Sequence, residues 1–244
     1  YSEKLGSHEK AAKHLEVLAE AAPDPEALDA LARIYRRQNS IRELAHVYRR
    51  QAALAPTPEA RKGLFFEVAT IMVEHLFDRE GAIDAYRQIL AIDPEDPNAL
   101  KLLGKLLGDA EQWDQLVEVL QREVEVAEKQ SDATAEALEL RFRLGRIRQQ
   151  RLADLAGALA CYQQVLGQVP RHPAAIAALE ELAQGSGAVA SDAASLLDPI
   201  YTHEGEHAKL VQALEARIGH APDARTRAAL LRRLANIYAG PLDS

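Results

Sequence analysis

Residues 71–97 read IMVEHLFDREGAIDAYRQILAIDPEDP, and 76 positions later residues 147–173 read IRQQRLADLAGALACYQQVLGQVPRHP. The two stretches share residues at many corresponding places. The matched positions of the first copy include Ile71, Leu76, Asp78, Ala82, Tyr86, Leu90, Pro94 and Pro97. Self-similarity at a fixed spacing is typical of repeat architectures, in which each unit buries its apolar face only against its neighbours.

The same frame extends toward both ends of the chain. A shift of 71 to 72 residues places Leu5 on Leu76 near the start, and a longer shift matches Leu144 with Leu234 near the end. We therefore expect one solenoid domain over residues 1–244, built from three super-repeats, 1–71, 72–147 and 148–237, and the start of a fourth. Because both ends cut the frame in mid-motif, we expect a fragment of a longer chain with further repeats.

Local signals indicate helices throughout, and strand signals are almost absent. Proline at a first helical turn, as at Pro25 and Pro97, starts a helix because its missing N–H would have no partner there. Apolar residues then recur at intervals of three and four residues, for example Leu28, Leu31 and Tyr35, which is the spacing of one face of a helix. The pattern predicts an all-α fold of about thirteen helices, near 8–22, 25–38, 41–54, 58–76, 79–92, 97–108, 112–130, 133–151, 155–168, 173–184, 191–203, 206–219 and 223–238. One of them is extra to the repeat and follows the break at residues 185–187.

Composition excludes several classes of function. Cys161 is the one cysteine, so an internal disulfide is impossible, and its apolar neighbours Ala158 and Tyr162 predict a buried, inert thiol. No apolar run reaches the ~18 residues of a membrane helix, so we expect no direct membrane insertion. The formal net charge of −8 disfavours nucleic acid as a partner. The compartment stays open between cytoplasm and cell envelope.

The segments resemble degenerate tetratricopeptide repeats. A Leu-small step in the first helix is present at Leu103-Gly104 and Leu144-Gly145, and the second half of the motif is present at Ala82, Tyr86 and Pro94 and again at Ala158, Tyr162 and Pro170. The resemblance implies a right-handed α-solenoid of antiparallel helix pairs. Arginine outnumbers lysine 21 to 8, which favours a bacterial multi-repeat protein.

The resemblance also implies a function, a non-catalytic scaffold that binds protein or peptide in a concave groove lined by first helices. Those predicted helices carry 16 basic and 10 acidic residues, and this excess of positive charge favours an acidic peptide or a C-terminal carboxylate as the partner. The candidate groove residues are Arg33, Arg36, Arg37, Phe66, Asn98, Lys101, Lys105, Phe142, Arg146, Arg232 and Asn236. Lys101, Lys105 and Arg146 resemble the carboxylate-gripping faces of some family members. The competing interpretation of the whole set is an ordinary solvated surface.

One stretch resembles a catalytic motif. Residues 203–207, HEGEH, fit the H-E-x-x-H pattern, in which two histidines one helical turn apart bind zinc. The repeat frame places Gly205 where Gly108-Asp109 makes a turn, and a turn there would separate the histidines. We therefore expect no metal site, no cofactor and no enzyme activity.

Two other interpretations of function stay open at this stage. The array could be a regulatory or sensor module of a larger enzyme or signalling protein, which flanking sequence would reveal. A zinc hydrolase would depend on residues 203–207 alone.

Overall fold

The computed structural model describes residues 2–21, 24–129 and 134–240, and within these ranges it contains helices and no strand. The helices are α1 (Ser2–Ala21), α2 (Pro25–Gln38), α3 (Ile41–Leu54), α4 (Pro58–Ile71), a π-helical segment η1 (Met72–Leu76), α5 (Arg79–Ile92), α6 (Pro97–Asp109), α7 (Trp113–Lys129), α8 (Thr134–Gln150), α9 (Leu155–Gln168), α10 (Pro173–Ala183), α11 (Ala188–Glu204), α12 (His207–Gly219) and α13 (Ala224–Tyr238). The predicted all-α class with about thirteen helices is confirmed. Four predicted helices, 25–38, 41–54, 79–92 and 155–168, have the observed bounds.

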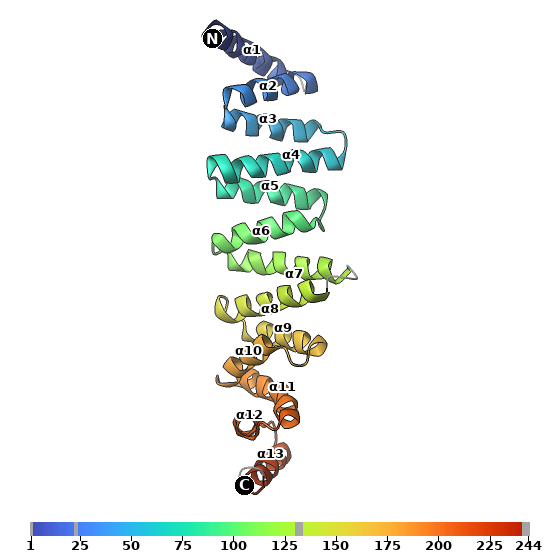
Figure 1. Ribbon diagram of the computed structural model, residues 1–244, viewed down its shortest axis with the longest axis vertical. Helices are drawn as coiled ribbons and strands as arrows, with labels where there is room; N and C mark the ends of the chain where they lie inside the picture. The colour runs from blue at the N-terminus through green and yellow to red at the C-terminus, as the bar shows by residue number, and fades with distance from the viewer. Residues whose placement is uncertain (1, 22–23, 130–133, 241–244) are drawn as a thin grey trace. The chain divides into compact units, whose positions relative to one another are not determined.

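The chain divides into two compact units, residues 1–112 and 113–244. Within the first unit, α1 to α6 pack each on the next and alternate in direction (Figure 1). Within the second unit, α7 to α13 do the same, and α11 additionally contacts α9. Each unit is thus a stretch of α-solenoid made of antiparallel helix pairs. The boundary falls inside the second expected super-repeat, and the division into three super-repeats stays a prediction.

The helices begin where the sequence supplies caps. The Oδ1 atom of Asp96 accepts a hydrogen bond from the backbone N–H of Ala99 at 2.9 Å, and the Nδ1 atom of His172 accepts one from Ala175 at 3.2 Å. In both helices proline follows the cap. Such caps satisfy a backbone N–H that has no partner within the helix and contribute about 1 kcal/mol each.

One predicted helix is interrupted in the structure, and two others, predicted at 8–22 and 191–203, begin earlier, at Ser2 and Ala188. We expected a continuous helix over 58–76, but α4 ends at Ile71 and five π-helical residues follow, closed by Phe77 at φ 51°. The wider turn arises because the backbone N–H of Phe77 reaches back five residues to the carbonyl of Met72. A bulky residue with positive φ is uncommon, and no local sequence signal predicts this conformation at Phe77.

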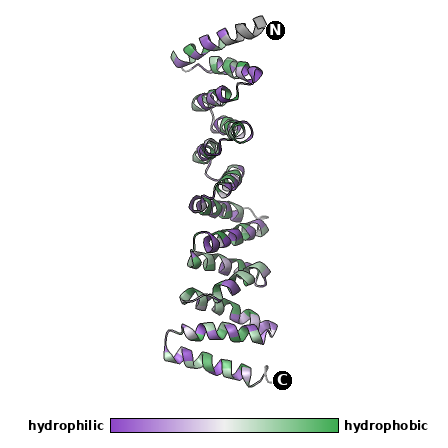
Figure 2. Ribbon diagram, turned by 90° about the vertical axis from the view of Figure 1, so that its left-hand side faces the viewer, coloured by the Kyte–Doolittle hydropathy of each residue, from purple (hydrophilic) through white to green (hydrophobic). Residues whose placement is uncertain are grey.

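The helices are amphipathic, and Figure 2 shows hydrophobic and hydrophilic residues alternating along the helices of both units. In α2 the side chains of Leu28 and Leu31 are buried, whereas Arg33 and Arg37 are exposed. Burying each leucine stabilises the fold by about 2 kcal/mol. None of the helices in the described parts of the chain is long and apolar enough to span a membrane.

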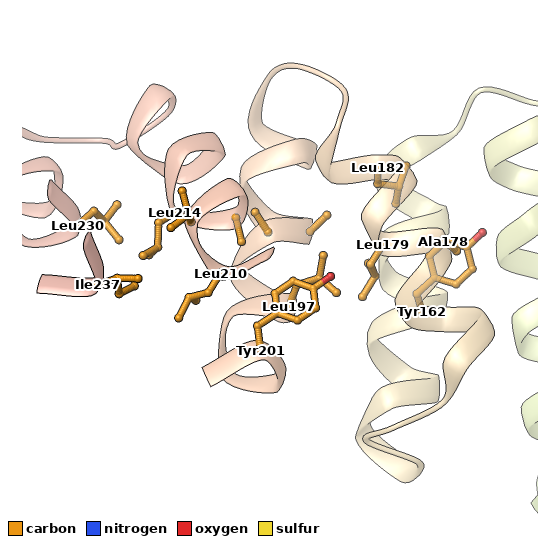
Figure 3. Packing of buried hydrophobic residues seen from close by; sticks show 14 of the residues in the cluster. Tyr162, Ala178, Leu179, Leu182, Leu197, Tyr201, Leu210, Leu214, Leu230 and Ile237 are labelled. Carbon is orange, nitrogen blue, oxygen red and sulfur yellow. The ribbon is translucent and has the colours of Figure 1, made fainter. Parts of the chain in front are cut away.

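The core of the second unit is continuous across five helices. Figure 3 shows its side chains in one row, from Tyr162 on α9 through Leu179 and Leu197 to Leu214 and Leu230. The predicted burial of Cys161 next to this row is confirmed, and burial raises the pKa of its thiol. A raised pKa leaves little reactive thiolate near neutral pH.

A buried carboxylate, which the sequence did not predict, joins the last three helices. Asp198 on α11 accepts two hydrogen bonds from Arg233 on α13, at 2.6 and 2.7 Å, and one from Arg217 on α12. Its side chain is almost fully buried. Because a buried charge is tolerated only when it is paired, these contacts fix the order of α11, α12 and α13.

Candidate functional site

The predicted groove residues are distributed over both units. Seven of them lie in the first unit, on α2, α4 and α6: Arg33, Arg36, Arg37, Phe66, Asn98, Lys101 and Lys105. Four lie in the second unit, on α8 and α13: Phe142, Arg146, Arg232 and Asn236. Lys101 and Lys105 therefore belong to a different unit from Arg146, and their joint grip on one carboxylate stays a prediction.

Two of these residues line a cavity of about 440 Å³ in the first unit, named here the α2–α4 groove. It is enclosed by three successive helices and the connection between the last two. Its walls are Pro25, Leu28, Asp29, Ala32, Arg33 and Arg36 of α2, Tyr48, Gln51 and Leu54 of α3, Ala55, Pro56, and Ala60 and Leu64 of α4. The volume lies within the range of ordinary ligand pockets.

The spacing of residues along α2 explains why its charged side chains border the groove. Leu28 and Ala32 are buried against α3, and the next stripe around the helix carries Asp29, Arg33 and Arg36 at i, i+4 and i+7. Residues three and four apart share one face of a helix. The polar stripe therefore runs beside the apolar floor, and a bound chain would meet both.

Three contacts hold the polar side chains of the groove in place. An Nη2 hydrogen of Arg36 is donated to the hydroxyl of Tyr48. The Nε2 of Gln51 donates to Oδ1 of Asp29 at 2.6 Å, and the Nε of Arg33 donates to the backbone carbonyl of Asp29 at 3.3 Å. These bonds orient the groove before any partner arrives, which reduces the entropy lost on binding.

A second set of contacts holds α1 against the back of the same helix pair. The hydroxyl of Tyr35 donates to Oε1 of Glu16 at 2.9 Å, and Arg50 forms an ion pair with Oε2 of Glu16 at 3.2 Å. Burial and the bond to Glu16 raise the pKa of Tyr35 to about 12. The phenol therefore stays protonated, and its role is to position α2 rather than to exchange a proton.

The charge of the groove favours an anionic ligand. Two guanidinium groups, of Arg33 and Arg36, accompany one carboxylate, that of Asp29. Among the described residues, no carboxylate is paired with the guanidinium of Arg33, whose side chain is exposed. A guanidinium can bind a carboxylate through two parallel hydrogen bonds. An acidic side chain or a chain terminus next to an apolar residue matches this surface.

The two predicted aromatic anchors are half-buried against other rings. Phe66 makes an edge contact with Tyr86, with ring centroids 6.2 Å apart. Phe142 lies between Tyr162 at 5.8 Å and His172 at 5.5 Å. These contacts join α4 to α5, and α8 to α9 and to the N-cap of α10, so both phenylalanines contribute to packing as well as to the surface.

The remaining candidates are mostly exposed. Asn98, Lys101 and Lys105 on α6, and Arg232 and Asn236 on α13, present their side chains to solvent. Arg37, in the last turn of α2, is also exposed. Arg146 differs from them because it forms an ion pair with Glu181 at 2.8 Å.

The H-E-x-x-H stretch is interrupted as predicted. Helix α11 ends at Glu204, Gly205 adopts the left-handed conformation at φ 72°, and α12 begins at His207. His203 instead contacts Arg171, with Nδ1 and Nη2 3.0 Å apart. No group of three metal-binding side chains occurs in residues 2–21, 24–129 and 134–240.

Sequence reasoning missed Tyr48 and Gln51, which line the α2–α4 groove from a second helix. The prediction concerned first helices only. The signal that could have found these residues is their spacing, because both lie on the face of α3 that also carries Leu44 and Val47 toward the core.

Comparison with known proteins identifies the repeat in the same region. The family model for the tetratricopeptide repeat matches residues 27–62, which contain most of α2, all of α3 and the start of α4. The α2–α4 groove falls almost entirely within this match. Among proteins with curated descriptions, none matches the sequence.

Solved structures with similar helix arrays include BtubC from P. vanneervenii, at 16% identity and a TM-score of 0.37, covering 98% of this chain and 91% of that one. YrrB, described as a TPR protein with an unusual peptide-binding site, is 18% identical with a TM-score of 0.38, covering 91% of this chain and 99% of that one. MamA is 11% identical with a TM-score of 0.38, covering 79% of this chain and 91% of that one. TM-scores below 0.5 do not establish a shared overall arrangement.

Proposed function

Because the chain is a tetratricopeptide-like array, a type of fold that generally serves as a non-catalytic interaction scaffold, we propose that it holds a protein or peptide partner in the α2–α4 groove. One observation carries the proposal. A cavity of about 440 Å³ with an apolar floor and two guanidinium groups lies within the segment that matches the repeat.

The chemistry of the groove specifies the partner further. We expect an extended segment with an acidic side chain or a free C-terminal carboxylate against Arg33 and Arg36, and with an aliphatic side chain on the floor formed by Leu28 and Leu64. Charge-assisted hydrogen bonds are about twice as strong as neutral ones when water is excluded. The carboxylate would supply orientation and the aliphatic group most of the buried apolar area.

The binding surface extends beyond this groove in the proposal. Asn98, Lys101 and Lys105 would extend it within the first unit, and Phe142, Arg146, Arg232 and Asn236 would belong to a separate surface of the second unit. Exposure of Lys101 and Lys105 and the absence of an acidic residue on α6 before Asp109 support the first extension.

The experiment measures binding of a fluorescent peptide of about ten residues that carries leucine, aspartate and a free C-terminus. Arg33→Ala with Arg36→Ala should weaken binding about a hundredfold or more, the effect of losing two charged hydrogen bonds worth about 1.5 to 3 kcal/mol each. Arg33→Lys should weaken binding less than Arg33→Ala. The lysine keeps the positive charge, although it cannot make the two-pronged contact of a guanidinium.

The matched control removes the same charge from the same unit. Arg42→Ala with Arg49→Ala changes two exposed arginines of α3 that do not line the groove. Equal weakening by both pairs would show that net charge alone governs binding, and the proposed groove would be wrong. Thermal unfolding of each variant separates lost binding from lost folding, since Arg36 also bonds Tyr48.

A further inference from the structure

A second and larger cleft, of about 750 Å³, lies in the other unit between α9 and α11. One wall is α9 near Leu166 and Gly167, and the opposite wall is α11 near Leu196, Pro199 and Ile200. This cleft is separate from the α2–α4 groove and involves no residue that was predicted to bind a partner.

The cleft depends on the extra helix of the repeat. Helix α11 follows the break at residues 185–187 and contacts α9 as well as its chain neighbours α10 and α12. Pro199 lies inside α11 and lines the cleft. A proline within a helix removes one backbone hydrogen bond and pushes the preceding turn away. At this position α11 therefore turns the pyrrolidine ring of Pro199 toward the cleft, in place of a longer side chain.

The floor of the cleft is apolar and rigidly supported. Leu166 and Leu196 are half-buried and pack against the continuous core of the second unit. The fully buried side chains of Tyr162 and Leu197 lie next to them along the same helices. A floor fixed by a packed core needs no rearrangement to receive an apolar side chain.

Charged groups are confined to one end of the cleft. Arg171, in the connection after α9, reaches across to α11, where its Nη2 lies 3.0 Å from Nδ1 of His203 and its Nε lies 3.4 Å from Oε1 of Glu204. The side chain of Arg171 is 64% exposed, and α9 itself carries no charged residue. The guanidinium therefore retains donors that face solvent at the mouth of the cleft.

The length of the walls sets the shape of the occupant. The lining residues of α11 run from Leu196 to Glu204, which is about 12 Å or two helical turns at 1.5 Å per residue. The residues of this wall follow the spacing i, i+3, i+4, i+7 and i+8. An apolar groove of two turns between helices matches the way in which amphipathic helices insert their side chains.

We infer that this cleft is a second binding groove, which receives two turns of an amphipathic helix from a partner protein, with aliphatic side chains on Leu166, Leu196 and Ile200 and a carboxylate of the partner beside Arg171. The partner's carboxylate competes with Glu204 for the guanidinium. The exposed donors of Arg171 favour an acidic flank over a basic one, and the apolar floor supplies the affinity.

Gly167 offers a way to fill the cleft without disturbing the fold. A Cβ atom added at this position meets no atom within 4 Å, and Gly167 lines the cleft. Gly167→Leu therefore places a side chain in the cleft, and it also replaces a poor helix former by a good one. Gly63→Leu is the matched control, because Gly63 is also helical with no atom within 4 Å of an added Cβ, but lies on α4 in the other unit.

The probes are two fluorescent helical peptides of about 16 residues with blocked ends. Both carry leucines at i, i+3, i+4 and i+7, and they differ only in having glutamate or lysine at both ends of the leucine stripe. We expect Gly167→Leu to weaken binding of the glutamate peptide about 30-fold or more, the loss caused by removing one interface hot spot. Gly63→Leu should leave binding unchanged.

The flank tests the role of Arg171. The parent protein should bind the glutamate peptide about fivefold more tightly than the lysine peptide at low salt, the usual size of a solvent-exposed ion pair, and Arg171→Gln should remove the difference. Arg33→Ala with Arg36→Ala should leave both affinities unchanged, so failure of one groove is distinguishable from failure of the other.

Three outcomes would overturn the inference. The first is unchanged affinity in Gly167→Leu, and the second is equal or tighter binding of the lysine peptide. The third is binding of neither peptide while the dye 1-anilinonaphthalene-8-sulfonate binds one-to-one and is displaced by Gly167→Leu, because the cleft would then receive a small amphiphile instead of a helix.

Discussion

The corner between α4 and α5 in the first unit and the corner between α8 and α9 in the second have the same local construction. In each, a non-glycine residue adopts the left-handed conformation, Phe77 at φ 51° and Ala153 at φ 54°. The next residue, Asp78 or Asp154, then caps the following helix by accepting a hydrogen bond at 2.9 Å from a glycine three residues later. The 76-residue repeat of the sequence thus corresponds to a repeat of backbone geometry.

The side chains that fill the two corners differ. In the second unit Gln149 accepts a hydrogen bond from the hydroxyl of Tyr162 at 2.7 Å and donates one to Glu181 at 3.1 Å. The positions 76 residues earlier hold Val73 in place of Gln149 and Lys105 in place of Glu181. The polar chain of the second corner therefore has no counterpart in the first.

This difference separates the residues that make the fold from those that are free to vary. Capping aspartates, small residues and the buried tyrosine recur because the turn and the close helix packing require them. The charge at position 105 or 181 is set by neither requirement, and it is basic in one unit and acidic in the other. Such positions can acquire specificity for a partner at little cost to folding.

The largest expected effect concerns that charge. The probe is the ten-residue peptide that carries leucine, aspartate and a free C-terminus. Lys101→Ala with Lys105→Ala should weaken its binding about a hundredfold, because two charged contacts, shielded by the bound peptide and worth about 1.5 to 3 kcal/mol each, are lost. Lys105→Glu, which gives the first unit the residue of the second, should weaken it further by repulsion. Fluorescence anisotropy measures both.

The control for this pair is Glu118→Ala with Glu125→Ala, which removes two exposed acidic residues of α7 and should leave binding unchanged. If the acidic pair proves to be the sensitive one, the partner binds through second helices and not through α6.

A smaller effect is expected at Gly145, where α8 lies close to α9. A Cβ atom added to Gly145 would lie 2.6 Å from Cε1 of Tyr162 and 3.0 Å from Cβ of Cys161. The corresponding residue of the first unit is Ala69, so the first corner accommodates the methyl group that the second excludes. Gly145→Ala should lower the free energy of unfolding by about 1 to 3 kcal/mol through overpacking.

Hydrogen exchange followed by mass spectrometry would locate the loss in peptides of the second unit. Gly167→Ala is the control, since its added Cβ meets no atom within 4 Å and should leave the unit as stable or slightly more stable. Undiminished stability of Gly145→Ala would show that the ring of Tyr162 does not close on the helix, and the two corners would then be alike.

Most of the helical architecture could be predicted because its signals are local. Proline at Pro25 and Pro97, capping aspartates and periodic leucines each act within one turn of chain, and α2, α3, α5 and α9 were predicted to the residue. The π-helical segment before Phe77 could not be predicted, since it depends on a backbone hydrogen bond across five residues, from Phe77 to Met72, that leaves no mark on composition.

The sites were less predictable because they depend on contacts between helices. Spacing alone puts Arg33 and Arg36 on one face of α2, but the neighbours that line the α2–α4 groove with them, Tyr48 and Gln51, come from another helix. The cleft beside Pro199 needs α11 to contact α9, which is not its neighbour along the chain. Periodicity determines which face of a helix is apolar and does not determine which other helix covers it.

The smallest effect is expected from breaking an ion-pair cluster that is present in the first unit and has no counterpart at the corresponding positions of the second. In the first unit Lys62 lies 2.6 Å from Oδ2 of Asp93 and 2.7 Å from Oδ2 of Asp96. The residues at the positions 76 later are Leu138, Val169 and His172, so the second unit lacks the cluster. The bond to Lys62 lowers the pKa of Asp93, and the bonds to Asp93 and Asp96 raise the pKa of Lys62.

These directions define the pH range in which the cluster contributes. A lowered carboxylate pKa stabilises the fold above the ordinary value of about 4 and ceases to do so as the pH falls below it, and a raised lysine pKa stabilises the fold below about 10 and ceases to do so above it. Lys62→Met should therefore reduce protection of the first unit against hydrogen exchange at pH 7 by up to about 1 kcal/mol, because the pair is partly exposed to solvent. At pH 3 the same substitution should have a much smaller effect, and protection of the second unit should be unchanged at both pH values. An equal loss at pH 3 and pH 7 would mean that the stem of Lys62, and not its charge, stabilises the first unit.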